Sequence, residues 1–126
     1  MREKLNNLLN NSYAKYSKFS VSCICVMNDG KEFCGVNVEN ASFGATICAE
    51  RVAITSAITS GYKKGDFCEL HIMVDSEKIA HPCFLCRQVI TEFFDSNSLI
   101  YLYSKNNTEV FSVEKLCPNP FSEDNL

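Results

Sequence analysis

The sequence has no apolar run that approaches the length of a membrane-spanning helix, and residues Met1 to Asn10 lack the apolar stretch of a secretory signal peptide. Internal repeats, low-complexity segments and linkers are also missing. We therefore expect a single domain covering residues 1–126, located in the cytoplasm and with no membrane partner. A chain of this length can bury one moderate hydrophobic core.

An excess of positive charge is missing as well. Twelve Lys and Arg residues stand against 15 Asp and Glu residues, which gives a net charge of -3 and a pI near 5.3. The basic residues are scattered along the chain instead of forming a patch. A phosphate backbone would gain no electrostatic attraction from such a surface, so we expect no nucleic-acid partner.

Cysteine, in contrast, is abundant, and three of the eight cysteines fall in two short motifs, Cys48-Ala49-Glu50 and Pro82-Cys83-Phe84-Leu85-Cys86. Three thiolates can bind Zn²⁺ and leave the fourth tetrahedral position open for water, which distinguishes a catalytic zinc site from a closed structural one. Glu50, two residues after Cys48, is well placed to move protons. This order of residues is the signature of zinc deaminases.

Five cysteines remain outside these motifs, and an odd number argues against a closed disulfide framework. A reducing compartment follows. We expect the five to be mostly buried thiols: Cys23, Cys25, Cys34, Cys68 and Cys117.

Hydrophobic periodicity predicts the element order αββαβαββ. The predicted helices run from the N-terminus to near Tyr16, over 48–60 and over 83–94, and the predicted strands cover 19–27, 33–38, 70–74, 99–103 and 109–112. Helices that alternate with strands indicate an α/β fold, a three-layer α/β/α sandwich around a five-stranded mixed sheet.

Both motifs begin helices in this scheme, and helix amino termini favour thiolates because they carry free N–H groups and partial positive charge. Arg51 and Arg87 each follow a motif residue by one position, and each is a candidate to donate hydrogen bonds to a ligand sulfur and offset its negative charge. The alternative is that they are surface arginines in salt bridges.

The chain resembles the small, homotetrameric cytidine deaminase family over nearly its whole length. The resemblance is carried by Tyr16-Ser17-Lys18-Phe19, Asn37-Val38-Glu39-Asn40-Ala41-Ser42-Phe43-Gly44, Ile47-Cys48-Ala49-Glu50-Arg51, Pro82-Cys83-Phe84-Leu85-Cys86-Arg87-Gln88-Val89 and Pro120-Phe121-Ser122. It implies one Zn²⁺ per subunit on Cys48, Cys83 and Cys86, a general acid and base in Glu50, and deamination of cytidine and deoxycytidine at C4 in pyrimidine salvage.

The resemblance also implies the substrate contacts. Asn37 and Glu39 would hydrogen-bond the ribose 3′-hydroxyl, Phe19 would pack near the substrate, the backbone around Ala49 would bind the pyrimidine, and Phe121 would reach the pocket of a neighbouring subunit. An Asn and a Glu two residues apart at a strand end point the same way, so they can bind one hydroxyl as donor and acceptor.

The chain departs from the family pattern near the ligands. Phe84 and Leu85 stand where the family usually has Gly and a small residue, and His81 replaces a common Ser. The bulky pair would either narrow the base pocket or fill space at a subunit contact. We expect His81 to be exposed and His71 to be a core or edge histidine with its hydrogen bonds satisfied.

Three alternatives to a cytidine deaminase stay open. A deaminase of a cytosine-nucleoside antibiotic of the blasticidin S type would keep the zinc motifs, but the intact Asn37-Val38-Glu39-Asn40 segment weighs against it. A deaminase that edits nucleic acid would need a channel of basic and aromatic residues. A structural zinc module would need a fourth protein ligand.

Overall fold

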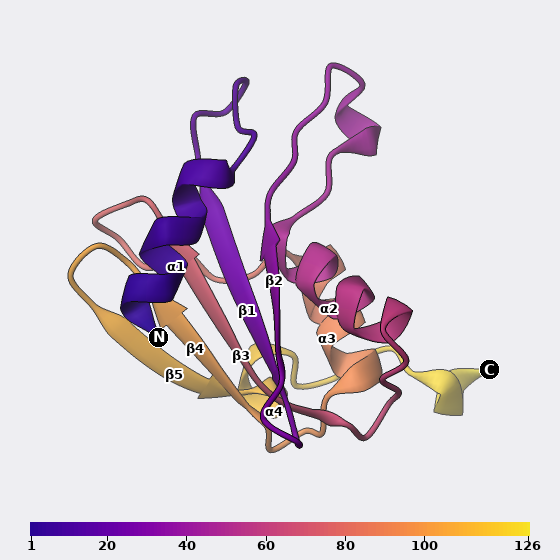
Figure 1. Ribbon diagram of the computed structural model, residues 1–126. Helices are drawn as coiled ribbons and strands as arrows, with labels where there is room; N and C mark the ends of the chain where they lie inside the picture. Colours follow the sequence, from indigo (N-terminus) through magenta and orange to yellow (C-terminus); the bar gives the residue numbers. More distant parts are fainter.

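Five strands form one sheet in the order β2-β1-β3-β4-β5, and the computed structural model describes all of residues 1–126 (Figure 1). The strands are β1 (Val21–Met27), β2 (Glu32–Val36), β3 (Phe67–Val74), β4 (Leu99–Tyr103) and β5 (Thr108–Ser112). β1 runs antiparallel to β2 and to β3, β3 runs parallel to β4, and β4 runs antiparallel to β5. The predicted five-stranded mixed sheet is confirmed.

Helices cover both faces of this sheet. They are α1 (Arg2–Leu8), α2 (Ala49–Thr59), α3 (Phe84–Phe93) and the single turn α4 (Val113–Leu116). Short 3₁₀ turns lie at Leu9–Asn11, Phe43–Ala45 and Glu123–Asn125. Figure 1 shows α1 on one side of the sheet and α2 with α3 on the other, which is the expected three-layer α/β/α arrangement. No helix has the length and the apolar content needed to cross a membrane.

The sheet is buried on both faces, as the alternating residues of β1 show. Cys23, Cys25 and Met27 belong to a cluster of 16 buried residues between the sheet and the helices α2 and α3. Ile24 points to the opposite face, where it joins Leu5 of α1 in a second cluster of four residues. Because side chains in a strand alternate between faces, a strand covered on both sides is apolar throughout.

A close approach of α2 to β2 depends on Gly35. A Cβ atom at this position would lie 2.3 Å from the carbonyl oxygen of Ala49 and 2.7 Å from the backbone nitrogen of Ala53. Glycine is therefore the residue that lets the first turn of α2, which contains Glu50, sit directly on the edge strand.

The predicted element boundaries are wrong in several places. The N-terminal helix was expected to reach Tyr16, but α1 ends at Leu8 and a 3₁₀ turn ends at Asn11, because Asn side chains compete with helical backbone hydrogen bonds. β1 begins two residues later than predicted, at Val21, and β2 ends two residues earlier, at Val36. β3 begins three residues earlier than predicted, and α4 was not predicted.

The expectation that the five remaining cysteines would be mostly buried is also wrong. Cys23 and Cys25 are buried in the core, whereas Cys34 and Cys68 are exposed and Cys117 is half-buried. Cys34 lies on β2, an edge strand in which only Gly35 is buried, so a side chain there does not have to be buried.

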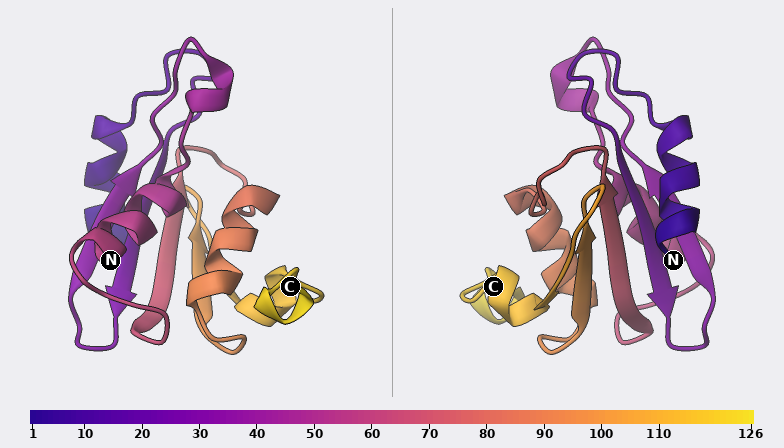
Figure 2. Two further views of the ribbon diagram at one scale, coloured as in Figure 1. Left: turned by 90° about the vertical axis from the view of Figure 1, so that its right-hand side faces the viewer. Right: turned by 90° about the vertical axis from the view of Figure 1, so that its left-hand side faces the viewer.

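The strand directions bring the predicted site segments to one end of the sheet. Val21, at the start of β1, pairs with Val74 at the end of β3, and Ser22 pairs with Val36 at the end of β2. The chain segments that precede β1, follow β2 and follow β3 therefore converge. In Figure 2 the loops before β1 and after β2 project together beyond the sheet, and the rings of Tyr16 and Phe43 make an edge contact between them.

Candidate active site

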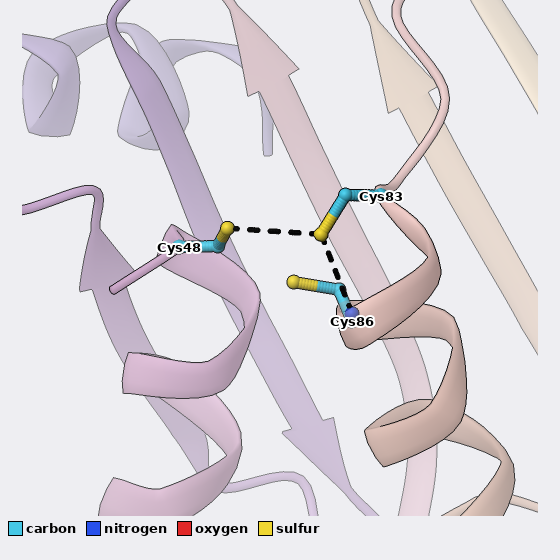
Figure 3. Close-up of side chains that lie close together, drawn as sticks. All are labelled: Cys48, Cys83 and Cys86. Carbon is cyan, nitrogen blue, oxygen red and sulfur yellow. Dashed lines mark hydrogen bonds between the residues drawn. The ribbon is translucent and has the colours of Figure 1, made fainter. Parts of the chain in front are cut away.

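The three predicted ligand sulfurs meet between the amino-terminal ends of α2 and α3 (Figure 3). Cys48 is the N-cap residue of α2, Cys83 is the N-cap residue of α3, and Cys86 lies in the first turn of α3. The Sγ atoms of all three lie within 4.8 Å of one another. No His, Asp or Glu ligand atom joins them.

This donor set fits Zn²⁺. A tetrahedral zinc ion with Zn–S bonds of about 2.3 Å holds its sulfur ligands about 3.8 Å apart, and the Sγ atoms of Cys48 and Cys83 are 3.8 Å apart. Three protein ligands without a fourth leave one coordination position open, which is the arrangement of a catalytic site. The absence of a fourth protein ligand argues against the structural zinc module.

Polar groups around the sulfurs stabilise a thiolate at Cys48. Hydrogen bonds from the Cys86 thiol, the Arg51 guanidinium and the Cys83 thiol lower the pKa of Cys48 to about 5, against the opposing effect of burial. The Nη2 atom of Arg51 lies 3.5 Å from the Cys48 sulfur. Cys48 and Arg51 are three residues apart and so share one helix face. The predicted contact between Arg51 and a ligand sulfur is present.

Glu50 lies in the first turn of α2 and is buried, with 5% of its surface exposed. Burial, with a smaller contribution from the negative charge of Cys48, raises the pKa of Glu50 to about 7. A carboxyl group that titrates near neutral pH can both accept and donate a proton, which is what a general acid and base must do.

Cys48, Cys83 and Glu50 border a cavity of about 260 Å³ whose lining is mostly apolar, and Cys86 is buried behind it. Its lining includes four more of the predicted site residues, Phe19, Asn37, Glu39 and Ala49. The volume of this cavity is slightly below the about 300 Å³ at which typical small-molecule pockets begin, and the cavity shares their combination of an apolar lining with a few polar groups. A larger open hollow of about 700 Å³ lies near the Asn28-Asp29 turn, but it contains none of the predicted site residues.

Comparison with known proteins agrees with this geometry. A family model described as the zinc-binding region of cytidine and deoxycytidylate deaminases matches residues 1–102, which is most of the chain and includes all three cysteines and Glu50. The chain belongs to the cytidine deaminase family. The three-thiol cluster accordingly fits one Zn²⁺, the cofactor of this family.

Individual family members are similar over almost their whole length. The cytidine deaminase of Sporosarcina psychrophila is 38% identical over 91% of this chain and 84% of its own. That of Mycoplasma genitalium is 34% identical over 96% of this chain and 92% of its own. The crystal structure of the cytidine deaminase from Burkholderia pseudomallei superimposes with a TM-score of 0.90, at 38% identity and with 94% of each chain covered.

Asn37 and Glu39 lie just beyond the end of β2, and loop atoms determine their orientation in the deaminase. The Oδ1 atom of Asn37 accepts hydrogen bonds from the Ser12 hydroxyl and from the backbone N–H of Val21. Its Nδ2 atom donates to the carbonyl oxygen of Phe19 at 2.8 Å. Both lone pairs of Oδ1 are used, so Asn37 can offer a ligand only its second N–H.

Phe121 is the one predicted substrate residue that does not line the cavity of its own chain. Phe121 is 58% exposed, while its carbonyl oxygen accepts a hydrogen bond of 2.9 Å from Nε2 of Gln88 on α3. The backbone of the tail is thus attached to α3 and the aromatic ring faces outward. Figure 2 shows the tail in yellow beside α3 and α4.

The predicted bond from Arg87 to a ligand sulfur is not found. Arg87 donates to the carbonyl oxygens of Pro82 and Leu116, at 2.7 and 2.6 Å, and its guanidinium lies 4.5 Å from the centre of the Phe84 ring. One residue after Cys86, its side chain leaves the helix about 100° away from the ligand. Through these two hydrogen bonds, Arg87 links the turn that contains Cys83 to the end of α4.

The residues that depart from the family pattern occupy different surroundings. His81 is exposed, as expected, and lines the cavity, with its ring 5.3 Å from that of Phe111. Phe84 and Leu85 are 75% and 67% exposed and do not line the cavity, so they do not narrow it within one chain. His71 is buried, and its two ring nitrogens contact Tyr103 and Glu69, so its hydrogen bonds are satisfied as expected.

Two serines that sequence reasoning missed also contribute to the site. Ser12 binds Asn37, and Ser17 donates to Glu39 from the neighbouring turn. The predicted N-terminal helix, which ends near Tyr16, would have placed Ser12 on its apolar face and so concealed its contact with Asn37, whereas Ser17 lies beyond that helix. The only signal of their role was the family segment that begins at Tyr16, and it contains just Ser17.

Proposed function

We propose that the protein catalyses the zinc-dependent hydrolytic deamination of cytidine and deoxycytidine to uridine and deoxyuridine, with release of ammonia. The observation that carries the proposal is the cluster of Cys48, Cys83 and Cys86, two of which line one cavity together with the buried Glu50. The relatives named cytidine deaminase support the same activity.

The residues divide the chemistry between them. Bound at the three thiols, Zn²⁺ makes water nucleophilic near neutral pH. Glu50 accepts a proton from the attacking water at its carboxylate and donates it to N3 of the pyrimidine ring, and it then moves the second proton of that water, from the C4 hydroxyl, to the departing amine. The backbone at Ala49, in the wall of the cavity, is placed to bind the pyrimidine ring.

We assign recognition of the ribose 3′-hydroxyl to Asn37 and Glu39. Both line the cavity, and the hydrogen bonds that Asn37 already makes leave it a donor. Hydrogen bonds from the Ser17 hydroxyl and backbone lower the pKa of Glu39, so it is an ionised acceptor. A donor and an ionised acceptor together match one hydroxyl group.

An ultraviolet assay of the purified protein, with zinc quantitation, tests the proposal. The substrates are cytidine, deoxycytidine, cytosine, cytidine monophosphate and blasticidin S. We expect turnover of the two nucleosides, far slower turnover of the free base and about one zinc ion per chain. Turnover of blasticidin S with none of the nucleosides would favour the antibiotic deaminase instead.

Replacing Glu39 by Ala should raise KM for cytidine strongly, by about ten-fold or more, because a hydrogen bond to a charged group is lost. The change should be much smaller for free cytosine, which has no ribose. Steady-state kinetics with both compounds measure the difference. If the parent protein deaminated cytosine as well as cytidine, the assigned role of Asn37 and Glu39 in sugar recognition would be wrong.

We propose further that the working unit is a homotetramer with sites completed across subunits. The exposed ring of Phe121, on a tail whose backbone is attached to Gln88, supports a contact with a neighbouring chain. Over a neighbour's cavity, this ring would exclude water and contribute about 1 kcal/mol beyond its buried area. The exposed Phe84 and Leu85 fit the expectation that they fill space at a subunit contact.

Truncation after Cys117 should raise KM for cytidine several-fold, because Phe121 is removed while α4 is retained. Light scattering measures the assembly of the parent and of the truncated protein, and Phe121→Ala serves as a variant that keeps the tail. A fully active monomer, or a truncated protein with an unchanged KM, would contradict the shared site.

We propose finally that the reaction belongs to pyrimidine salvage in the cytoplasm, where thiols stay reduced and available to a metal.

A further inference from the structure

Ser17 lies outside the cavity but is hydrogen-bonded to two residues that line it. Its hydroxyl donates to Oε2 of Glu39 and accepts a hydrogen bond of 3.0 Å from the backbone N–H of Phe19. Its own backbone N–H donates to Oε1 of Glu39 at 3.0 Å, and the N–H of Tyr16 donates to the same oxygen at 2.9 Å. Glu39 and Phe19 are therefore held through one side chain.

These bonds fix the direction of the Glu39 carboxylate. An ionised carboxylate has about four positions at which it accepts hydrogen bonds, and the Ser17 hydroxyl, the Ser17 N–H and the Tyr16 N–H occupy three of them. These three hydrogen bonds restrict the rotamer of the Glu39 side chain, and Ser17 provides two of the three donors. One acceptor position remains for a ligand in the cavity.

The backbone around Ser17 is held in an uncommon conformation. Lys18 has a φ angle of 60°, in the left-handed region that side chains other than Gly, Asn and Asp seldom adopt. Its N–H donates to the carbonyl oxygen of Ala14 at 2.9 Å, which closes the turn. A strained turn persists only where surrounding bonds determine it, and the bonds between Ser17, Glu39 and Phe19 do so here.

We propose that Ser17 is a positioning residue for nucleoside recognition: it holds the Glu39 carboxylate toward the ribose 3′-hydroxyl. The inference rests on the proposed function, in which Glu39 binds the sugar. Ser17 itself touches neither the substrate nor the zinc site. Its loss affects binding of the nucleoside and leaves the proton transfers of Glu50 intact.

Ser17→Ala is expected to raise KM for cytidine about ten-fold, the usual size for a lost hydrogen bond to a charged group, with kcat changed less than about two-fold. Turnover of 2′,3′-dideoxycytidine, which has no 3′-hydroxyl, should be unchanged in kcat/KM. Ser17→Thr keeps the hydroxyl and should restore the parental KM. Ser60→Ala, at an exposed serine whose hydroxyl makes no hydrogen bond, is the matched control.

A double-mutant cycle with Glu39→Ala completes the test, because residues that act through one another are not additive. Adding Ser17→Ala to Glu39→Ala should produce no further rise in KM for cytidine. A strong effect of Glu39→Ala with none of Ser17→Ala would overturn the positioning role alone. Equal losses with cytidine and with dideoxycytidine would show that Ser17 only supports the fold of the loop, and would overturn it too. If Glu39→Ala had no effect, sugar recognition by Glu39 and the role of Ser17 would both be wrong.

Discussion

Replacing Glu50 by Gln is expected to lower kcat for cytidine about 100-fold or more while zinc stays bound, because general acid and base catalysis is worth about 100-fold to 10,000-fold. The amide of Gln has nearly the same size and shape as the carboxyl group but cannot take up or release a proton. Glu50 does not belong to the group of three sulfur ligands, so its replacement removes no metal ligand. The fold should also be retained, since a neutral amide replaces a buried carboxyl whose pKa is raised to about 7.

Steady-state assays of cytidine turnover check the loss of kcat, zinc quantitation checks that the metal stays bound, and thermal denaturation checks that the fold is retained. Glu109→Gln is the matched control, since Glu109 is exposed on β5 and far along the chain from the zinc ligands. Turnover near the parental rate with zinc retained would assign the proton transfers to another group.

The layers of the fold could be predicted from local patterns because each pattern acts over a few residues. The alternation from Phe19 to Met27 predicts a strand, of which β1 covers all but the first two residues, and the run from Leu99 to Tyr103 matches β4 at both ends. Where elements end was less predictable. Val38 pairs with both Tyr13 and Ile47 through isolated bridges, so tertiary contacts decide where β2 stops.

The zinc ligands could be predicted because their spacing along the chain carries the chemistry. Cys83 and Cys86 are one helical turn apart, and Cys48 begins a helix two residues before Glu50. The partners of Arg87 were not predictable in the same way. Its guanidinium donates to Leu116, 29 residues further along, and nothing in the local sequence indicates that contact.

The oxygen contacts around Asn37 and Glu39 were hidden for a similar reason. The hydroxyls of Ser12 and Ser17 come from a segment more than 20 residues earlier, which only the tertiary fold brings beside the end of β2. A serine carries no sequence signal that separates a surface hydroxyl from one that orients a carboxylate. The structure was needed to bring these side chains together.

Replacing Cys86 by Ala is expected to remove zinc and to abolish turnover of cytidine. Cys86 is fully buried at the amino terminus of α3, and it provides one of only three protein ligands. Two remaining thiols cannot complete the three-ligand set of a catalytic zinc site. The zinc content after dialysis, measured by elemental analysis, should fall from about one zinc ion per chain to nearly none.

The same variant tests whether the metal stabilises the fold. Because metal binding to the native state adds its free energy to folding, a chelator should lower the melting temperature of the parent protein and leave that of Cys86→Ala unchanged. Cys68→Ala, at an exposed thiol outside the cluster, is the matched control and should keep both the zinc and the response to the chelator. A Cys86→Ala protein with full zinc content and parental turnover would show that the metal is held elsewhere, and the assignment of Cys48, Cys83 and Cys86 as its ligands would fail.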